Sequence, residues 1–278
     1  MKRISVLPNV ITAFGLFCGL FVIFKMNMIS SGLVPIEVLT AMSGILLLGA
    51  LADLLDGAVA RALKAESEFG GIFDSLADAV TFGVAPSVVV LKSLSLSSGG
   101  VMSFLATSGG MIFSVCGILR LARYNVLANH SKENPPPSSG YDKNFVGLPI
   151  PAAAMATVSI NLLMLSEDLT SLFEFSQYSR VWVLFITQIL LGYFMISRWK
   201  FLSFKSLRFR LSSFRIVSAS VIAAVFLFYG LLHNFAIAFF LLSWLYIIVA
   251  WCLSIARIVA GKRSTTLEDF EPEDPDVV

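Results

Sequence analysis

Runs of apolar residues long enough to cross a lipid bilayer recur along the whole chain, and they restrict its fold more than any other feature. A hydrocarbon core about 30 Å thick needs roughly 20 consecutive apolar residues in a helix. Hydrophobic residues make up 57% of the 278 positions and charged residues only 14%, whereas a soluble domain has about 25% charged residues. The sequence therefore predicts a polytopic membrane protein.

Helices are the expected spanning elements, because each backbone polar group in lipid needs a partner within the protein. The apolar runs predict an all-α membrane bundle of about eight transmembrane helices. Their approximate ranges are 9–25, 36–60, 71–91, 100–122, 146–166, 179–197, 214–231 and 234–256. The first run has no small-residue cleavage site and leads into further runs, so we expect a retained span rather than a signal peptide.

Basic residues are distributed unevenly among the predicted loops. With the N-terminus in the cytoplasm, 17 of the 20 Lys and Arg residues fall on cytoplasmic segments, and only Lys25, Lys92 and Arg180 fall outside. The positive-inside rule then predicts an integral protein of the cell membrane with both termini cytoplasmic. We expect residues 1–260 to form the transmembrane domain and the acidic residues 261–278 to form a disordered tail.

Four aspartates interrupt the apolar pattern near the predicted turn between the second and third helices. Asp53 and Asp56 share one face of the second helix, and Asp74 and Asp78 share one face of the third. The polar residues 62–70 connect the two helices on the cytoplasmic side. The spacing therefore predicts a helical hairpin on which four carboxylates face one another near the inner membrane surface.

Four carboxylates this close together need positive charge, because like charges repel and ionised groups are costly within a membrane. Arg61 neutralises only one of them. Carboxylate oxygens suit Mg²⁺, Mn²⁺ or Ca²⁺, and four of them suit two ions about 3.5–4 Å apart that hold a phosphoryl group. The structural alternative is a salt network in which Arg61 and Lys64 pair with the aspartates.

Two other functions are compatible with buried carboxylates in a membrane. A divalent-cation transporter would use them to line an ion path, which requires acidic residues at mid-membrane or on both sides. The clustering of these aspartates near one surface disfavours that function. A non-catalytic membrane scaffold would not need four converging carboxylates. Two metal ions that hold a phosphoryl group explain the cluster better than either.

The complete pattern is Asp53-x-x-Asp56-Gly57-x-x-Ala60-Arg61, eight residues, then Gly70-x-x-x-Asp74-x-x-x-Asp78. It resembles the signature of the CDP-alcohol phosphotransferases, which displace CMP from a CDP-linked lipid with an alcohol. The stretches "DSLADAVTFGVAPS", "ILRLARYNV", "FVGLPIPAAA" and "MISRWKFLSFK" look like the integral-membrane phosphatidylserine synthases of that family. The resemblance covers most of residues 3–256.

The resemblance implies roles for individual residues. Two divalent ions, Mg²⁺ or Mn²⁺, are implied, one held by Asp53, Asp56 and Asp74 and the other by Asp53, Asp74 and Asp78. Asp78 is also the implied base that takes a proton from the attacking hydroxyl. The residues expected to hold the CDP moiety or another substrate group are Asn9, Gly57, Ala60, Arg61, Ser67, Gly70, Arg120 and Arg123.

Some of these residues have simpler alternatives. Asn9 and Thr12 follow Pro8, and both are as typical of helix capping as of the contact with the nucleotide that the resemblance implies. Arg120 and Arg123 are either cytoplasmic anchors or a clamp on a phosphate or on the serine carboxylate. The basic and aromatic run 198–215 reads as an interfacial segment that contacts anionic lipid.

The resemblance also implies the partners. The expected substrates are CDP-diacylglycerol, or its ether-lipid equivalent, and L-serine, with glycerol phosphate or an inositol-type alcohol as the alternative acceptor. A second copy of the chain is expected in a homodimer. The net charge of +2 gives no reason to expect binding to nucleic acid.

Overall fold

The computed structural model describes residues 6–29, 34–65, 67–96, 99–133, 145–171, 173, 175–197, 200–201 and 234–259. Within these ranges, six helices are long and apolar enough to cross a membrane. They span Val6–Met28, Ile36–Ala62, Glu68–Leu94, Val101–Val126, Gln177–Ile196 and Phe235–Cys252. This confirms the predicted all-α, polytopic membrane bundle. The predicted span 214–231, the tail 261–278 and nearly all of the basic run 198–215 lie outside the described residues.

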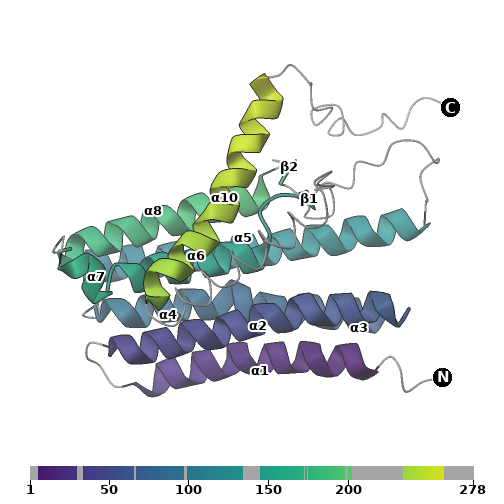
Figure 1. Ribbon diagram of the computed structural model, residues 1–278, viewed down its shortest axis with the longest axis horizontal. Coiled ribbons are helices and arrows are strands. Elements are labelled where there is room, and N and C mark those ends of the chain that lie inside the picture. Colours follow the sequence, from purple (N-terminus) through teal and green to yellow (C-terminus); the bar gives the residue numbers. More distant parts are fainter. Residues whose placement is uncertain are drawn as a thin grey trace, which may run out of the picture.

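The elements follow one another in a simple order (Figure 1). The first part of the chain contains α1 (Val6–Met28), α2 (Ile36–Ala62), α3 (Glu68–Asp78), the π-helical segment η1 (Ala79–Val84), α4 (Ala85–Leu94) and α5 (Val101–Glu133). The second part contains β1 (Phe145–Val146), α6 (Ile150–Leu163), α7 (Glu167–Thr170), α8 (Gln177–Ile196), β2 (Lys200–Phe201) and α10 (Phe235–Val259). The two short strands pair antiparallel.

The third span is a continuous helix with a wide turn in its middle, where the sequence predicted a regular helix over 71–91. The N–H of Ala85 bonds to the carbonyl of Val80, five residues earlier, which is the π-helical pattern. Pro86 follows in the first turn of α4. Proline has no N–H, and its ring would clash with the carbonyl four residues earlier in an α-helix. The wide turn accommodates Pro86, and it begins directly after Asp78.

Helix α6 is shorter than the span predicted over 146–166, although it crosses the bundle. At its start the Leu148 N–H bonds to the carbonyl of Phe194 at the end of α8, and near its end Asn161 accepts a bond from Ser93 at the end of α4. The helix covers only 14 residues, which is about 21 Å and is shorter than a hydrocarbon core of about 30 Å. Pro149 precedes it, and ten of its residues are buried. A helix that is apolar on all sides is typical of a core helix. In this chain α6 therefore fills the centre of the bundle.

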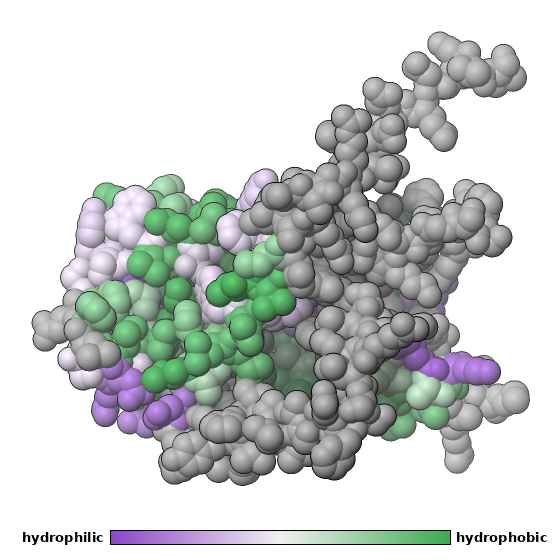
Figure 2. Space-filling model, turned by 45° about the horizontal axis from the view of Figure 1, so that its top comes forward, coloured by the Kyte–Doolittle hydropathy of each residue, from purple (hydrophilic) through white to green (hydrophobic). Residues whose placement is uncertain are grey.

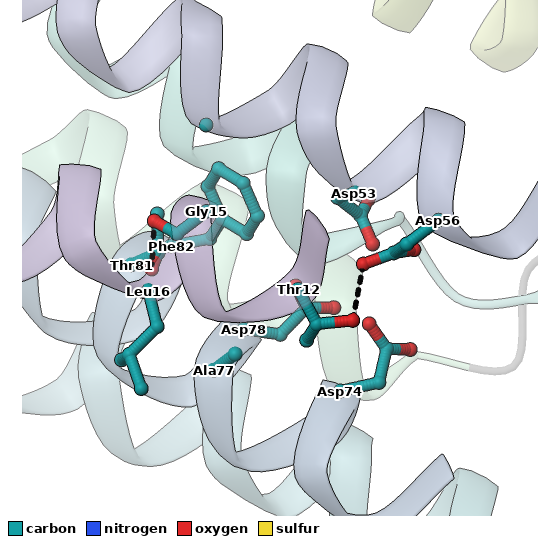
Figure 3. A pocket seen from close by; sticks show the side chains of 11 residues that line it. Thr12, Gly15, Leu16, Asp53, Asp56, Asp74, Ala77, Asp78, Thr81 and Phe82 are labelled. Atoms are coloured by element: carbon teal, nitrogen blue, oxygen red, sulfur yellow. Dashed lines mark hydrogen bonds between the residues drawn. The ribbon is translucent and has the colours of Figure 1, made fainter. Parts of the chain in front are cut away.

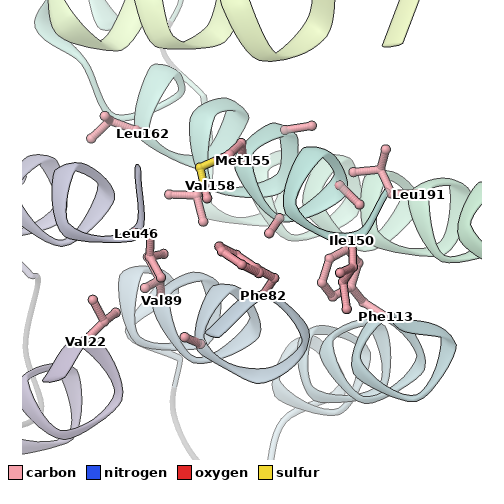
Figure 4. Close-up of a cluster of buried hydrophobic side chains, with 14 of the residues drawn as sticks. Val22, Leu46, Phe82, Val89, Phe113, Ile150, Met155, Val158, Leu162 and Leu191 are labelled. Carbon is pink, nitrogen blue, oxygen red and sulfur yellow. The ribbon is translucent and has the colours of Figure 1, made fainter. Parts of the chain in front are cut away.

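The main core lies where α6 meets η1, α4 and α5. Phe82, Phe113 and Ile150 are almost completely buried there (Figure 4). In Figure 1, α1 and α2 run side by side, as do α5 and α8, and α10 crosses α6 at a steep angle. On the outside, apolar side chains form a broad patch with hydrophilic residues gathered toward its edges (Figure 2). The outer surface thus suits contact with lipid.

Helix α1 approaches the third span closely at Gly19. A Cβ atom on Gly19 would lie 2.5 Å from Thr81 Oγ1, so only glycine fits without a shift. The Thr81 hydroxyl also donates a hydrogen bond to the carbonyl of Gly15, at 3.3 Å. These contacts fix α1 against η1, one turn beyond Asp78. They set the position of α1 relative to the aspartates.

Candidate metal and substrate site

The turn between α2 and α3 has the form that the sequence predicted. Helix α2 ends at Ala62 and α3 begins at Glu68. The Ser67 hydroxyl caps α3 by accepting a hydrogen bond from the Gly70 N–H, at 3.0 Å. This cap fixes the start of α3 and hence the direction of the residues on its following turns.

Three of the four aspartates converge from the two helices of this hairpin. Carboxylate oxygens of Asp53, Asp56 and Asp74 lie within 4.8 Å of one another. Asp78 lines the same pocket, one turn further along the third span (Figure 3). Asp56 is the most buried of the group, with 5% of its surface exposed. The structure thus brings the predicted metal ligands together at one end of the bundle.

Helix α1 contributes a hydroxyl group to this cluster. The Thr12 hydroxyl donates to Asp56 Oδ2 at 2.6 Å and also approaches the carbonyl of Pro8, at 3.1 Å. Thr12 and Asn9 both lie inside α1, so neither is a cap of that helix. Thr12 was a candidate for contact with the nucleotide, but its bond to Asp56 was not predicted, because sequence spacing gives no reason to pair it with an aspartate 44 positions later.

Three of the residues expected at the nucleotide lie together where α1 passes the start of α3. A Cβ atom on Gly70 would lie 3.0 Å from Ser67 Oγ and 3.1 Å from Asn9 Oδ1. Because Gly70 has no side chain, both polar groups lie against the backbone of α3. Ser67 has a structural contact as a cap, and Asn9 borders the same turn.

The remaining predicted residues of α2 lie beside Asp56. The exposed side chain of Arg61 folds toward Gly57, where a Cβ atom would lie 3.3 Å from Arg61 Nη1. Ala60 is half-buried one turn beyond Asp56. The absence of a side chain at Gly57 therefore leaves room for the guanidinium group near the C-terminal end of α2.

The two predicted arginines of α5 have different surroundings. Arg120 is half-buried, and Asp78 is among its electrostatic neighbours. Arg123 Nη1 instead donates to the carbonyl of Ile196, at 3.0 Å, at the end of α8. Arg123 thus ties the end of α8 to α5, whereas Arg120 lies close enough to Asp78 for an electrostatic interaction.

The aspartates open into a pocket that extends between α1, α2 and η1. Its volume, including the open mouth, is about 190 Å³. The described residues that line it are Thr12, Gly15, Leu16, Gly49, Asp53, Asp56, Asp74, Ala77, Asp78, Thr81 and Phe82. Four carboxylates thus share this lining with no Lys or Arg. Such a set of hard oxygen donors without balancing cations fits divalent metal ions.

Comparisons with known proteins agree with the motif. The family model described as CDP-alcohol phosphatidyltransferase matches residues 5–194. A CDP-diacylglycerol–serine O-phosphatidyltransferase of Helicobacter pylori is 31% identical over 93% of this chain and 96% of its own. One of Methanocaldococcus jannaschii is 33% identical over 66% of this chain and 77% of its own.

A third relative has a different name. The archaetidylserine synthase of Methanothermobacter thermautotrophicus is 37% identical over 46% of this chain and 49% of its own. Proteins of the matched family generally depend on divalent metals, and the cluster of Asp53, Asp56 and Asp74 is a candidate metal site. All four aspartates fall inside the matched residues. With its membrane-spanning helices, the chain is an integral membrane protein that belongs to the CDP-alcohol phosphatidyltransferase family.

Proposed function

We propose that this chain is a phosphatidylserine synthase, which transfers the phosphatidyl group of CDP-diacylglycerol to the hydroxyl of L-serine and releases CMP. The observation that carries the proposal is the convergence of three carboxylates at 4.8 Å or less in a member of this family. The names of relatives that align over most of the chain support serine as the acceptor. One relative is named archaetidylserine synthase. The CDP-linked donor of this chain is therefore CDP-diacylglycerol or its ether-lipid equivalent.

Two divalent ions, Mg²⁺ or Mn²⁺, are part of this proposal. Asp53, Asp56 and Asp74 would hold one of them, and Asp53, Asp74 and Asp78 the other. The fit rests on the short separation of the carboxylate oxygens and on the all-carboxylate charge of the pocket lining. When bound, such ions neutralise a diphosphate and stabilise charge on a transferred phosphoryl group.

The side chains of the site have separable tasks in the transfer. Asp78 accepts the proton of the acceptor hydroxyl while that oxygen forms a bond to the β-phosphorus of the CDP-lipid. The bond from this phosphorus to CMP breaks, and CMP leaves with the bonding electrons. Thr12 holds the carboxylate of Asp56 in place through its hydrogen bond. The guanidinium group of Arg61 lies beside the backbone of Gly57. From there its side chain would rotate to bind a phosphate.

The nucleotide is expected where the start of α1 meets the hairpin. Asn9, Ser67 and Gly70 lie together there, and Gly57 and Ala60 lie on α2 nearby. The CDP headgroup enters from the cytoplasm and the lipid tails remain in the bilayer, because the aspartates lie near one end of the spans. Arg123 is the weakest of the predicted substrate residues, since its guanidinium already binds Ile196.

The orientation and assembly are also proposals. Both termini would be cytoplasmic in the cell membrane, because 17 of the 20 basic residues then lie inside. Residues 1–260 would form the transmembrane domain, residues 261–278 an acidic tail, and two copies a homodimer. An engineered cysteine near Val278 should resist a membrane-impermeant reagent in intact cells. Labelling of that cysteine from outside would show that the C-terminus is not cytoplasmic.

One assay tests the proposed activity directly. Purified protein is incubated with CDP-diacylglycerol, Mg²⁺ or Mn²⁺ and one alcohol at a time: L-serine, glycerol phosphate or inositol phosphate. CMP release should require L-serine, should stop with excess chelator and should return when the metal is restored. CMP release only with another alcohol would show that this alcohol, and not L-serine, is the acceptor. Full turnover in excess chelator would exclude the two-ion site.

A further inference from the structure

Arg180, near the start of α8, is a buried cation for which the described residues provide no partner. Only 8% of its surface is exposed, and its Nε and Nη2 atoms are buried and make no hydrogen bond with any described residue. No described carboxylate acts on its charge. An arginine stays protonated, and an unpaired charge away from water is costly. A ligand with negative charge would therefore stabilise this position.

This arginine lies at the end of the bundle opposite the aspartates. The C-terminal end of α8 lies on the aspartate side, because the Ile196 carbonyl there accepts a bond from Arg123, three residues after the Arg120 that interacts with Asp78. The 16 residues from Arg180 to Ile196 correspond to about 24 Å of helix. In Figure 1, α8 begins at the end of the bundle far from the N-terminus. Arg180 is therefore separate from the aspartate pocket.

Aromatic residues place Arg180 at the depth of lipid headgroups. Tyr178 and Trp182 flank it in the chain, are exposed, and have ring centroids 6.5 Å apart. Such residues gather where a membrane meets water, because their rings are apolar and their tips are polar. On the buried side, the next residue, Val181, belongs to an apolar cluster formed by α4, α5 and α8. Arg180 thus lies at the membrane interface but on the inward side of its helix.

The start of α8 adds backbone donors to the same place. The carbonyl of Ser176 accepts a bond from the Arg180 N–H, and its hydroxyl accepts one from the Ser179 N–H. The N–H groups of Gln177 and Tyr178, the first two residues of the helix, have no partner within it. These groups and the helix dipole favour an anion. Helical side chains lean toward the N-terminus, so the guanidinium group of Arg180 and the free N–H groups both attract negative charge there.

We propose that Arg180 and the first turn of α8 bind the phosphate group of an anionic phospholipid in the leaflet opposite the aspartates. The guanidinium fork holds two phosphate oxygens, and the negative charge balances the arginine. A lipid fits better than a soluble anion, because the site lies at headgroup depth beside the exposed side chain of Phe173. The lipid would also brace the junction where Gln177 Nε2 donates to the carbonyl of Leu94, at 2.7 Å. This inference does not depend on the proposed reaction.

Lipid binding to purified full-length variants in detergent tests the site. Phosphatidylglycerol is titrated into wild type and Arg180→Met, and binding is followed by thermal stabilisation and by native mass spectrometry. Arg180→Met should weaken binding roughly tenfold or more, as expected when bonds to a charged group are lost. Arg180→Lys keeps the charge without the fork; it should bind with intermediate affinity, and it provides the comparison if Arg180→Met does not fold. Lys25→Gln removes an exposed charge in the last turn of α1. It is the matched control and should bind as wild type does.

Stability without lipid separates this site from a structural ion pair. After delipidation, Arg180→Met should be at least as stable as wild type, because an apolar side chain replaces an unpaired buried charge. Glu174 lies outside the described residues. Equal losses of stability in Arg180→Met and Glu174→Gln without lipid would show an internal ion pair and overturn the proposal.

The choice of ligand has its own outcomes. Phosphatidylcholine, whose choline group balances its phosphate, should stabilise wild type less than phosphatidylglycerol does, and inorganic phosphate should stabilise it least. Equal stabilisation by either of them would exclude an anionic lipid as the ligand. Unchanged phosphatidylglycerol binding in both Arg180→Met and Arg180→Lys would exclude Arg180 from the site.

Discussion

Two of the buried polar regions among the described residues differ in how their polar groups are satisfied. Between α4, α5 and α6, small side chains pair with one another: Ser93 donates to Asn161 at 2.8 Å, and the hydroxyls of Ser87 and Ser114 lie 3.1 Å apart. In the aspartate pocket, carboxylates converge, and the described part of the lining includes no basic residue. The first region is complete within the protein, whereas the second needs positive charge from elsewhere.

This difference separates two uses of polar residues inside a membrane. A closed hydrogen-bonded pair holds helices together, and its contribution is small because alternative partners exist in the unfolded state. Clustered charges oppose folding unless a ligand balances them. Substitutions in the first region should therefore affect stability, and substitutions in the second should affect metal binding and turnover.

The largest effect is expected for Asp53→Asn. Asp53 belongs to both proposed ion sites, so its loss should weaken metal and nucleotide binding together. The rate of CMP release should fall by at least the 10²–10⁴-fold that is typical of removing a catalytic acid or base. The metal concentration for half-maximal activity should also rise. Unchanged metal dependence would show that Asp53 does not bridge the two sites.

Asp78→Asn should lower the rate by about 10²–10⁴-fold but retain CDP-lipid affinity better than Asp53→Asn. The reason is that Asp78 belongs to one proposed ion site and acts mainly as the base. CMP release and nucleotide affinity are measured for both variants side by side. Near wild-type turnover at saturating metal and serine would exclude Asp78 as the base.

Thr12→Val should have a moderate effect, because it removes one hydrogen bond to a carboxylate while keeping the shape of the side chain. A bond to a charged group contributes about 1.5–3 kcal/mol, so activity at limiting metal should fall roughly tenfold or more. Thr12→Ser restores the hydroxyl and should restore activity. If Thr12→Val keeps the metal dependence of the wild type, the 2.6 Å contact between Thr12 and Asp56 has only a structural role.

The smallest effect is expected for Ser93→Ala in the paired region. It removes the bond to Asn161, and pairs of this kind contribute about 0.6 kcal/mol on average in a membrane protein. Unfolding in mixed detergent should show a slight loss of stability, and CMP release should not change. Ser108→Ala, whose hydroxyl is exposed and bonds within its own helix, is the control. A large loss of activity in Ser93→Ala would break the division between the two regions.

The parts of the molecule that sequence predicted are those that depend on local periodicity. The aspartate faces of α2 and α3 follow from spacing of three and four residues, and the hairpin follows from the polar residues 62–70 between two apolar runs. The length of the apolar runs, eight of which were predicted as spans, gave the six long spans of the described residues. The family signature added roles to Asp53, Asp56, Asp74 and Asp78, but it gave no contacts between helices.

The parts that sequence did not predict depend on tertiary packing. The bond between Thr12 and Asp56 joins α1 to α2, and no local pattern records it. An apolar run of twenty residues predicts a full-length helix, although α6 crosses the core with only 14 helical residues between Pro149 and Ser166.

The π-helical segment η1 has a consequence for the rotational phase of the third span. An α-helix turns by about 100° per residue, and a π turn holds an extra residue within a helix. The aspartate face before η1 and the packing face after it are thus offset from the positions that a regular helix would give them. A one-residue deletion between Ala79 and Val84 would restore regular phase and swing Asp74 and Asp78 away from Asp53, although every aspartate would remain in the chain.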